Sequence, residues 1–426
     1  MPAKPDTCVA ILGAGPAGLG AAYMLAQRGF KVVVLEKLDR VGGNAGSFEL
    51  AGIPVDFGSH RLHPASDPAV LAMIGELLGG DLLERPRHGR IRLMGRWLRF
   101  PLKTPDLMIH APPLFVLGVL KDLLAKLLPG KNKGDKTFSD ILQNGLGTTV
   151  CEEFYFPYAR KIWGMEPVDL SPIQAQKRVS SGSIGTLLKK LLPSPAGPHN
   201  EGNKGIFYYP RNGFGQISEA LFSAAVQSGA EIRLGASVKR LLLRSDGHHV
   251  EFEQQGKPQS VNVQHVWSTI PITTLSRLVE PPAPEDVSEA ARSLRFRGMV
   301  LIYLVLDTQQ FTPFDAHYLP GADIRITRLS EPKNYAARTK PQDRTVLCAE
   351  LPCQPGDDVW KLEDSALGQL VLDDLAQAGI PVECEVKEVS IRRLPHAYPL
   401  YPVGFEDALD VLDDWAQGLV NVLTFG

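Results

Sequence analysis

Two short apolar runs and one helical stretch open the chain. Residues 9–12 (VAIL) and 31–35 (KVVVL) have the length and composition of strands buried in a parallel sheet. Residues 16–28 between them have the length of a helix, and Gly29 follows as its stop signal. The pattern therefore predicts a strand–helix–strand unit at the start of the chain.

The turn after the first strand has the spacing G-x-G-x-x-G, formed by Gly13, Gly15 and Gly18. The first glycine permits a tight turn, the second lets the backbone approach a pyrophosphate, and the third brings the helix close to the strand. The helix begins at Pro16 and Ala17, and its free N–H groups and positive dipole end suit phosphates.

An acid closes this unit. Glu36 follows Gly13 by 23 residues, directly after the second strand. A carboxylate at this spacing accepts both ribose hydroxyls of a dinucleotide and disfavours a 2′-phosphate. The unit therefore predicts a Rossmann-type, dinucleotide-binding α/β domain. A glycine-rich turn in another α/β fold is the alternative.

The residues after this acid resemble a flavin-dependent family. It includes amine oxidases, protoporphyrinogen oxidases, phytoene-type desaturases and UDP-galactopyranose mutases, and the sequence is closest to the mutase-like branch. The resemblance implies FAD as the cofactor, because nicotinamide dehydrogenases lack this extension. Two segments carry the resemblance: the R-x-G-G-N sequence at 40–44 and the G-S-H-R-L-H-P sequence at 58–64. The resemblance implies cofactor contacts at Arg40, Gly42, Gly43, Asn44, Gly58, Ser59 and His60.

Further cofactor contacts follow from the same resemblance. Residues 237–238 and 268–271 (STIP) resemble the places where the second half of the FAD domain contacts adenine and pyrophosphate. Val238 and Thr269 are therefore expected cofactor-binding residues, and so is Lys37 beside the acid.

We expect a discontinuous domain organisation. Residues 299–306 and 345–351 have the pattern of strands, and residues 364–378 that of a helix. The expected units are an FAD-binding domain (1–70, 205–275 and 396–426), a helical cap or substrate domain (71–204) and a β-rich substrate-binding domain (276–395).

The end of the chain departs from the family pattern. In relatives, the strand that resembles residues 419–426 is followed by a glycine turn and a helix that points at the flavin. No such helix follows Gly426, so we expect a truncated sequence, with weakened FAD binding if this end is real.

Composition and charge exclude several classes. The net charge of −2 gives no indication of nucleic-acid binding, and five cysteines without metal-site spacing fit a reduced, cytoplasmic compartment without a metal. No signal peptide is visible, and the longest apolar stretch, 111–120, is half of the roughly 20 residues that a transmembrane helix needs. Oligomeric state does not follow from the sequence.

Two leucine-rich segments contain lysines. Residues 114–128 and 187–192 are amphipathic. Such helices can lie on a membrane surface or line a lipid-like substrate, but a helix that covers the substrate domain is the favoured interpretation.

Two histidines are candidate catalytic residues. The resemblance places His60 and His63 near the flavin, as their counterparts contact it in mutase relatives. An imidazole there can act as an acid or base near neutral pH. The alternative is that both histidines bond only loop backbone.

Basic residues crowd the segment 85–103. Alternation of charged and apolar residues predicts a hairpin with one basic face. Arg92 and Arg99 are therefore candidates for binding an anionic substrate, such as a nucleotide sugar, a polyprenyl phosphate or a porphyrin-like carboxylate. A solvated strand face explains the pattern equally well. The basic residues are Arg85, Arg87, Arg90, Arg92, Arg96, Arg99 and Lys103.

Four aromatic residues are candidate substrate contacts by resemblance: Tyr155, Trp163, Tyr398 and Tyr401. Their rings can stack on a base or sugar. Packing in the core is the alternative.

Three functions remain open at this point. The first is an FAD-dependent oxidoreductase that moves a hydride from an apolar or anionic small molecule onto flavin N5. Residues 298–305 contain no lysine, and Ile302 aligns with the lysine that oxygen-using amine oxidases usually carry there. The second is a non-redox mutase, in which reduced flavin attacks a nucleotide sugar. The third is a flavin-binding protein without catalytic activity.

Overall fold

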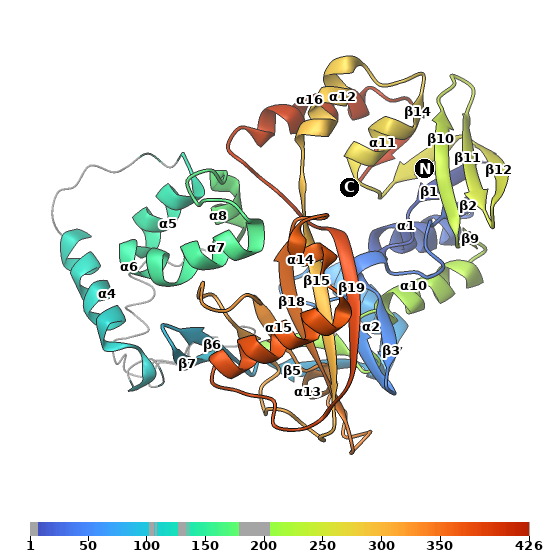
Figure 1. Cartoon of the computed structure of the whole chain (residues 1–426). Helices are drawn as coiled ribbons and strands as arrows, with labels where there is room; N and C mark the ends of the chain where they lie inside the picture. Colours follow the sequence, from blue (N-terminus) through green and yellow to red (C-terminus); the bar gives the residue numbers. More distant parts are fainter. Residues whose placement is uncertain are drawn as a thin grey trace.

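The computed structural model describes residues 7–101, 106, 109–126, 134, 136–178 and 205–425 (Figure 1). Its N-terminal strands β1 (Cys8–Leu12) and β2 (Lys31–Leu35) pair in parallel, and α1 (Pro16–Gln27) connects them. The predicted strand–helix–strand unit is thus confirmed. The unit lies within a five-stranded parallel sheet of order β20-β13-β1-β2-β9, completed by β20 (Val422–Thr424), β13 (His265–Ser268) and β9 (Glu231–Arg233).

Both faces of this sheet are covered. Val9 and Ile11 pack on the helices, whereas Ala10 and Leu12 pack on a β-meander, as the two-residue period of a strand requires. This burial on both sides explains the continuous apolar runs of the sequence. The helices are α1, α2 (Pro68–Leu78) and α10 (Gln216–Gln227). The meander consists of β10 (Ala236–Leu242), β11 (His248–Gln254) and β12 (Lys257–Val263), and β14 (Val279–Glu280) pairs in parallel with β10.

A seven-stranded sheet is the second large sheet of the fold. Helix α15 (Asp364–Gln377) covers one face, and the hairpin of β3 (Ser47–Leu50) and β4 (Ile53–Asp56) packs on the other. The strands and the helix predicted around residues 299–306, 345–351 and 364–378 are confirmed. The strand order is β19 (Val386–Pro399), β15 (Phe296–Leu306), β18 (Thr345–Cys353), β17 (Arg328–Ser330), β16 (Ala316–Tyr318), β6 (Gly89–Leu93) and β7 (Arg96–Phe100).

The basic segment forms the predicted hairpin, because β6 and β7 pair around a turn at Met94 and Gly95. Strand β6 also pairs in parallel with β16. The seven-stranded sheet therefore joins strands from the ranges 71–204 and 276–395, which the sequence assigned to different units. The domain boundaries themselves stay a prediction, and Lys103 lies outside the described residues.

A helical cluster packs beside this sheet (Figure 1). Phe138 and Trp163 lie in its core, and Thr137 and Asp140 form a reciprocal cap at the start of α5. The cluster consists of α4 (Pro113–Lys126), α5 (Phe138–Leu146), α6 (Thr148–Val150), a π-helical turn (Cys151–Tyr155), α7 (Phe156–Trp163) and α8 (Pro172–Arg178).

The remaining elements are short or peripheral. They are α11 (Ile272–Leu278), α12 (Glu285–Ser293) and α16 (Phe405–Gln417), which pack together, the strand pair β5 (Leu82–Pro86) and β8 (Ile206–Pro210), α13 (Pro332–Tyr335), α14 (Asp358–Lys361), and 3-10 turns at Gly43–Ala45 and Gly79–Asp81. Within the described ranges, no helix has the length and apolar character needed to cross a membrane. The predicted cytoplasmic location is not tested by this finding.

Candidate functional site

The glycine turn after β1 leaves no room for side chains. Gly13 has a φ of +100°, and a Cβ there would lie 2.8 Å from Thr269 Oγ1. A Cβ on Gly18 would lie only 2.1 Å from the carbonyl oxygen of Gly13. The Thr269 hydroxyl donates to the carbonyl of Leu12 at 2.9 Å. The three residues thus pack the start of α1 against the ends of β1 and β13.

Open space lies beside this turn. No atom lies within 4 Å of a Cβ placed on Gly15, and the nearest atom to a Cβ on Gly43 is Gly15 Cα at 4.0 Å. Gly42 holds the second segment in place, because its N–H donates to the carbonyl of Ala14 at 2.8 Å. Pro16 is exposed at the adjacent start of α1, as is Ala17. The geometry fits a pyrophosphate held between two glycine backbones and a helix N-terminus.

Glu36 lies at the carboxyl end of β2 beside the same turn. Its side chain is 6% exposed, and its two carboxylate oxygens accept from the N–H groups of Ala14 at 2.7 Å and Leu38 at 2.9 Å. The N–H of Ala236 donates to the Glu36 carbonyl, which starts β10 next to the acid. The structure therefore fixes the carboxylate where the ribose of a dinucleotide is expected. Val238 follows on β10, half-buried, whereas Lys37 is exposed.

A chain of contacts leads from the glycines to a second loop. The Arg40 guanidinium donates to the carbonyl of Gly43 at 3.0 Å and lies 3.9 Å above the Phe57 ring. The Asn44 amide donates to the carbonyl of His396, at the end of β19, at 3.3 Å. The R-x-G-G-N segment thus connects the pyrophosphate groove to the loop that begins at Phe57.

That loop carries His60. Gly58 has a φ of +99°, and the Ser59 N–H donates to Glu350 Oε1 at 2.9 Å. The Ser59 hydroxyl is buried and has no hydrogen-bond partner among the described residues, which leaves a polar group for a ligand. His60 Nε2 lies 3.0 Å from the carbonyl oxygen of Phe57, and its ring lies 5.3 Å from that of Phe214.

A buried carboxylate supports this loop. Asp56 is 1% exposed and accepts from the Tyr209 hydroxyl at 2.7 Å, from the Phe214 N–H at 2.8 Å and from the Ser47 hydroxyl at 2.6 Å. Burial raises the pKa of Asp56, and these donors oppose the shift. These hydrogen bonds therefore hold Asp56 in place at the start of the loop that carries His60.

His63 lies apart from this arrangement. Its side chain is exposed, and its Nδ1 accepts from the N–H of Ala65 at 3.0 Å. This local bond fits the alternative in which the histidine only orders loop backbone. A catalytic role for either histidine remains a proposal.

A buried ion pair faces the His60 loop, and the sequence analysis missed it. Arg328 donates from Nε at 2.9 Å and from a terminal nitrogen at 2.6 Å to Glu350 Oε1. Glu350 is 3% exposed. The strand register aligns Leu301, Glu350, Arg328 and Tyr318 across four strands, so their side chains share the face on which Ser59 binds. A glutamate within nine consecutive buried strand residues is the signal that could have revealed the pair.

Two tyrosines, Tyr158 and Tyr398, lie near this pair. Tyr158 is half-buried, and desolvation raises the pKa of its hydroxyl, while the nearby Arg328 opposes the shift. Tyr398 packs at the junction of the helical core and the sheet. The other two tyrosine candidates pack on neighbouring rings. The ring centroids of Tyr155 and Phe154 are 4.9 Å apart, and those of Tyr401 and Phe405 are 4.7 Å apart.

Trp163 lies deeper than a ligand contact would require. Its side chain is 5% exposed, and its ring packs edge-on against Phe138 at 5.4 Å. The helical core thus favours the packing interpretation for Trp163.

The two candidate arginines lie on the opposite face of the sheet. Arg99 pairs across the hairpin with Arg90, which aligns with His317 and, through it, with Leu329 and Ala349 beneath α15. Arg92 shares this face, because it follows Arg90 by two residues. The register therefore separates both arginines from Arg328 and Glu350.

Their charges have protein partners. Arg92 donates to Asp323 at 2.6 Å, with its own side chain 13% exposed. Arg99 is 65% exposed and lies 3.9 Å from Asp106. This arrangement favours the solvated strand face over substrate binding.

The residue that faces the His60 loop from β15 is Leu301, not Ile302. Ile302 is packed under α15, whereas a Cβ on Gly58 would lie 3.8 Å from Leu301 Cδ2. Strand β15 carries no lysine at either position.

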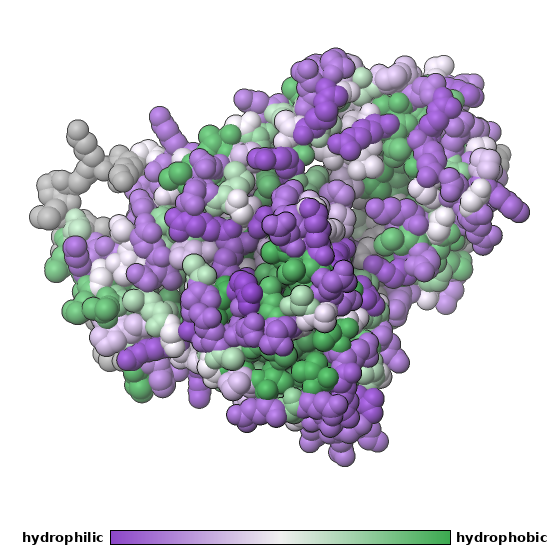
Figure 2. All heavy atoms as spheres, viewed as in Figure 1, coloured by the Kyte–Doolittle hydropathy of each residue, from purple (hydrophilic) through white to green (hydrophobic). Residues whose placement is uncertain are grey.

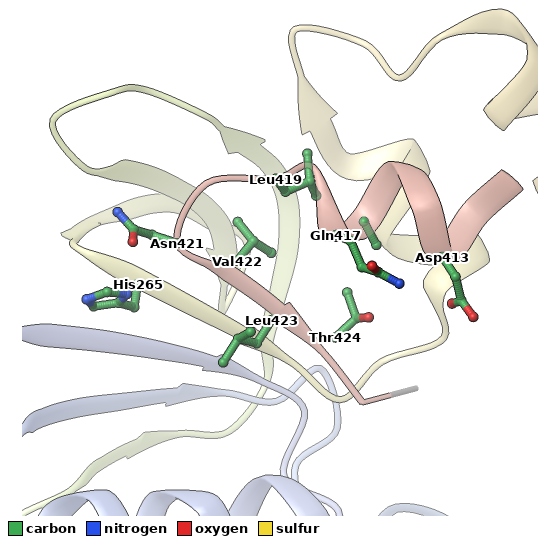
Figure 3. A pocket seen from close by; sticks show the side chains of 9 residues that line it. His265, Asp413, Gln417, Leu419, Asn421, Val422, Leu423 and Thr424 are labelled. Atoms are coloured by element: carbon green, nitrogen blue, oxygen red, sulfur yellow. The ribbon is translucent and has the colours of Figure 1, made fainter. Parts of the chain in front are cut away.

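A separate cavity of about 730 Å³ lies along β20 and α16 (Figure 3). Its lining includes His265, Asp413, Gln417, Asn421 and Thr424, none of which was a candidate from the sequence. Strand β20 is separated from β1 by β13, so the cavity lies apart from the open space beside Gly15 and Gly43.

Replacing Glu36 with glutamine should weaken FAD binding about 10- to 100-fold, because a charge-assisted hydrogen bond to the ribose hydroxyls contributes about 1.5–3 kcal/mol. Flavin fluorescence titration of the deflavinated protein measures the change. Glu231→Gln on the neighbouring β9, whose side chain is 59% exposed, is the matched control and should bind FAD normally. Equal affinities for both variants would contradict the role of Glu36.

Comparison with known proteins identifies the family of the chain. The pattern of the family described as flavin containing amine oxidoreductase matches residues 16–420. The chain is 29% identical to AofH of Mycobacterium tuberculosis, whose name describes a flavin-containing monoamine oxidase, over 66% of this chain and 61% of that protein. It thus spans about three fifths of the length of these first relatives.

Two further proteins are similar over nearly the whole chain. The chloroplastic protoporphyrinogen oxidase of Nicotiana tabacum is 26% identical over 96% of this chain and 78% of its own. Reduced UDP-galactopyranose mutase has a similar fold, with a TM-score of 0.84 and 18% identity over 99% of this chain and 89% of that structure. With the glycine groove, Glu36 and the family pattern in agreement, the chain belongs to the flavin containing amine oxidoreductase family, with FAD as its cofactor.

Proposed function

We propose that the protein is an FAD-dependent oxidoreductase that removes a hydride from a small-molecule substrate. One observation carries this proposal: an unbroken set of contacts runs from the Gly13 turn through Arg40 and Phe57 to the Ser59–Glu350 bond. It joins a dinucleotide groove to a loop that meets a buried charged pair.

The residues along this path would divide the work. FAD, when bound, supplies a two-electron acceptor for hydride. The backbones of Gly15 and Gly43 would hold its pyrophosphate, and Glu36 would bind its ribose. His60, fixed by the Phe57 carbonyl, would hold or move a proton at its imidazole. The helical cluster and the sheet would limit the access of water to Tyr158 and Arg328.

For the substrate we propose an apolar body with an anionic group. Arg328 uses two of its five N–H donors in the bonds to Glu350, and a guanidinium binds carboxylates and phosphates through such forks. Tyr158 and Tyr398 would supply apolar and aromatic surface. The names of relatives include an amine oxidase and an L-amino-acid oxidase, so amines and amino acids belong in the first substrate panel.

Anaerobic mixing tests this function. The purified protein should carry bound flavin, and a substrate should bleach its visible absorbance without any added reductant. A second candidate is a mutase, named by the structural neighbour, which would convert a nucleotide sugar only after the flavin is reduced. The second proposal would replace the first if no member of the panel bleached the flavin and the protein converted a nucleotide sugar after reduction by dithionite.

A protein that retains flavin but shows neither reaction would support the third possibility, a flavin-binding protein without activity. Oligomeric state is measured in the same preparation by light scattering.

A further inference from the structure

Helix α4 presents an apolar face whose leucines stay largely exposed in the part of the chain that the structure describes. Leu114, Leu117 and Leu124 are 73%, 62% and 65% exposed, and Leu120 is 49% exposed. Their spacing of three or four residues places them on one side of the helix. Ile109, just before the helix, is 71% exposed. The contiguous leucines, rather than any single one, make this surface unusual for a soluble domain.

The opposite side of α4 fixes this orientation. Phe115 and Val119 pack on the helical core. A Cβ on Gly118 would lie 2.6 Å from Thr149, so the helix lies in close contact there. The helix therefore cannot bury its leucines by rotation without losing these contacts.

The exposed charge on the described part of α4 is that of a lysine. Asp122 is turned inward, where it accepts from the N–H of Thr149 at 2.6 Å, whereas Lys121 is exposed. The sequence from 107 to 136 contains five lysines and two aspartates, a net charge of 5 − 2 = +3 in a chain of net charge −2. A leucine face with an exposed lysine, in a segment of net positive charge, matches the chemistry of an anionic lipid surface.

We propose that α4 is a docking helix that lies in the headgroup region of an anionic membrane, with its leucines among the acyl chains. Its 14 residues span about 21 Å, which suits an orientation in the membrane plane rather than across it. The helix lies at the edge of the molecule (Figure 1), and apolar atoms are visible on that edge in the space-filling view (Figure 2). A symmetric contact with a second copy would bring the lysines of both copies together, which disfavours that occupant.

Vesicle flotation of the full chain tests this proposal. The protein should float with vesicles of phosphatidylcholine and phosphatidylglycerol, less with phosphatidylcholine alone, and less at high salt. The double variant Leu117→Glu/Leu124→Glu should reduce the floated fraction at least about tenfold. Lys121→Glu keeps the leucines and should weaken binding only to the anionic vesicles.

A matched control separates the face from general effects of charge. Met24→Glu/Val226→Glu changes two residues that are 44% and 46% exposed on α1 and α10, and it should float like the parent. Flavin content and thermal midpoint should be equal in all variants, which shows that they are folded.

Three results would overturn the proposal: a parent protein that does not float, an α4 double variant that floats like the parent, or a parent dimer that the double variant converts to a monomer without any vesicle binding. The last result would identify a second copy as the occupant. None of these measurements needs a substrate, so they do not depend on the proposed oxidoreductase activity.

Discussion

Replacing Gly18 with alanine is expected to abolish retention of flavin. The new Cβ would lie 2.1 Å from the carbonyl oxygen of Gly13, and this neighbour is backbone rather than the end of a flexible side chain. The start of α1 must therefore move away from β1, which opens the groove between Gly15 and Gly43. We expect at least about a tenfold loss of FAD affinity and a loss of about 1–3 kcal/mol in stability.

Gly20→Ala provides a matched control in the same helix. No atom lies within 4 Å of a Cβ at Gly20, so the methyl group meets no obstacle. Alanine is the better helix former by about 1 kcal/mol, so stability should stay equal or rise. Flavin content after desalting and thermal unfolding measure both variants. A Gly18→Ala protein that keeps its flavin would show that the close approach of α1 to β1 is not needed.

The sequence predicted the nucleotide-binding half of the molecule well, because its signals are local. A strand buried on both faces must be apolar at every position, and the Gly13 turn needs a φ that other residues rarely adopt. Glu36 could be placed because the length of α1 and β2 sets its distance from the turn. Each of these features is decided within about 30 residues of chain.

The other half of the site depends on pairing between distant strands. Alternation in the segment from Arg90 to Arg99 predicts a basic face, but not which side of the sheet this face covers. That side follows from the pairing of β6 with β16, more than 200 residues away. Likewise, Arg328 and Glu350 meet only through the register of β17 and β18. The sequence likewise does not decide which of Leu301 and Ile302 faces the His60 loop, since neighbouring strand residues point to opposite sides of the sheet.

The second large effect is expected for Glu350→Ala. It would leave the Arg328 guanidinium without its carboxylate in the interior, and breaking one partner of a buried ion pair costs about 3–5 kcal/mol. We expect the lower end of this range, because the Arg328 side chain keeps 22% exposure. The Ser59 N–H would also lose its acceptor, so the His60 loop should loosen. Chemical denaturation measures the loss of stability, and flavin content reports on the loop.

An exposed pair of equal length shows why burial decides this effect. Arg292 and Glu285 are also 2.6 Å apart, but their side chains are 58% and 76% exposed, so water replaces either partner. Glu285→Ala should therefore change stability by no more than about 0.5 kcal/mol. Glu350→Gln keeps an acceptor for Ser59 but not the charge, so it should retain more flavin than Glu350→Ala while still losing stability. If Glu350→Ala and Glu285→Ala unfolded at the same denaturant concentration, Arg328 would have to be solvated in the folded protein, and its role in binding an anionic substrate would lose its physical basis.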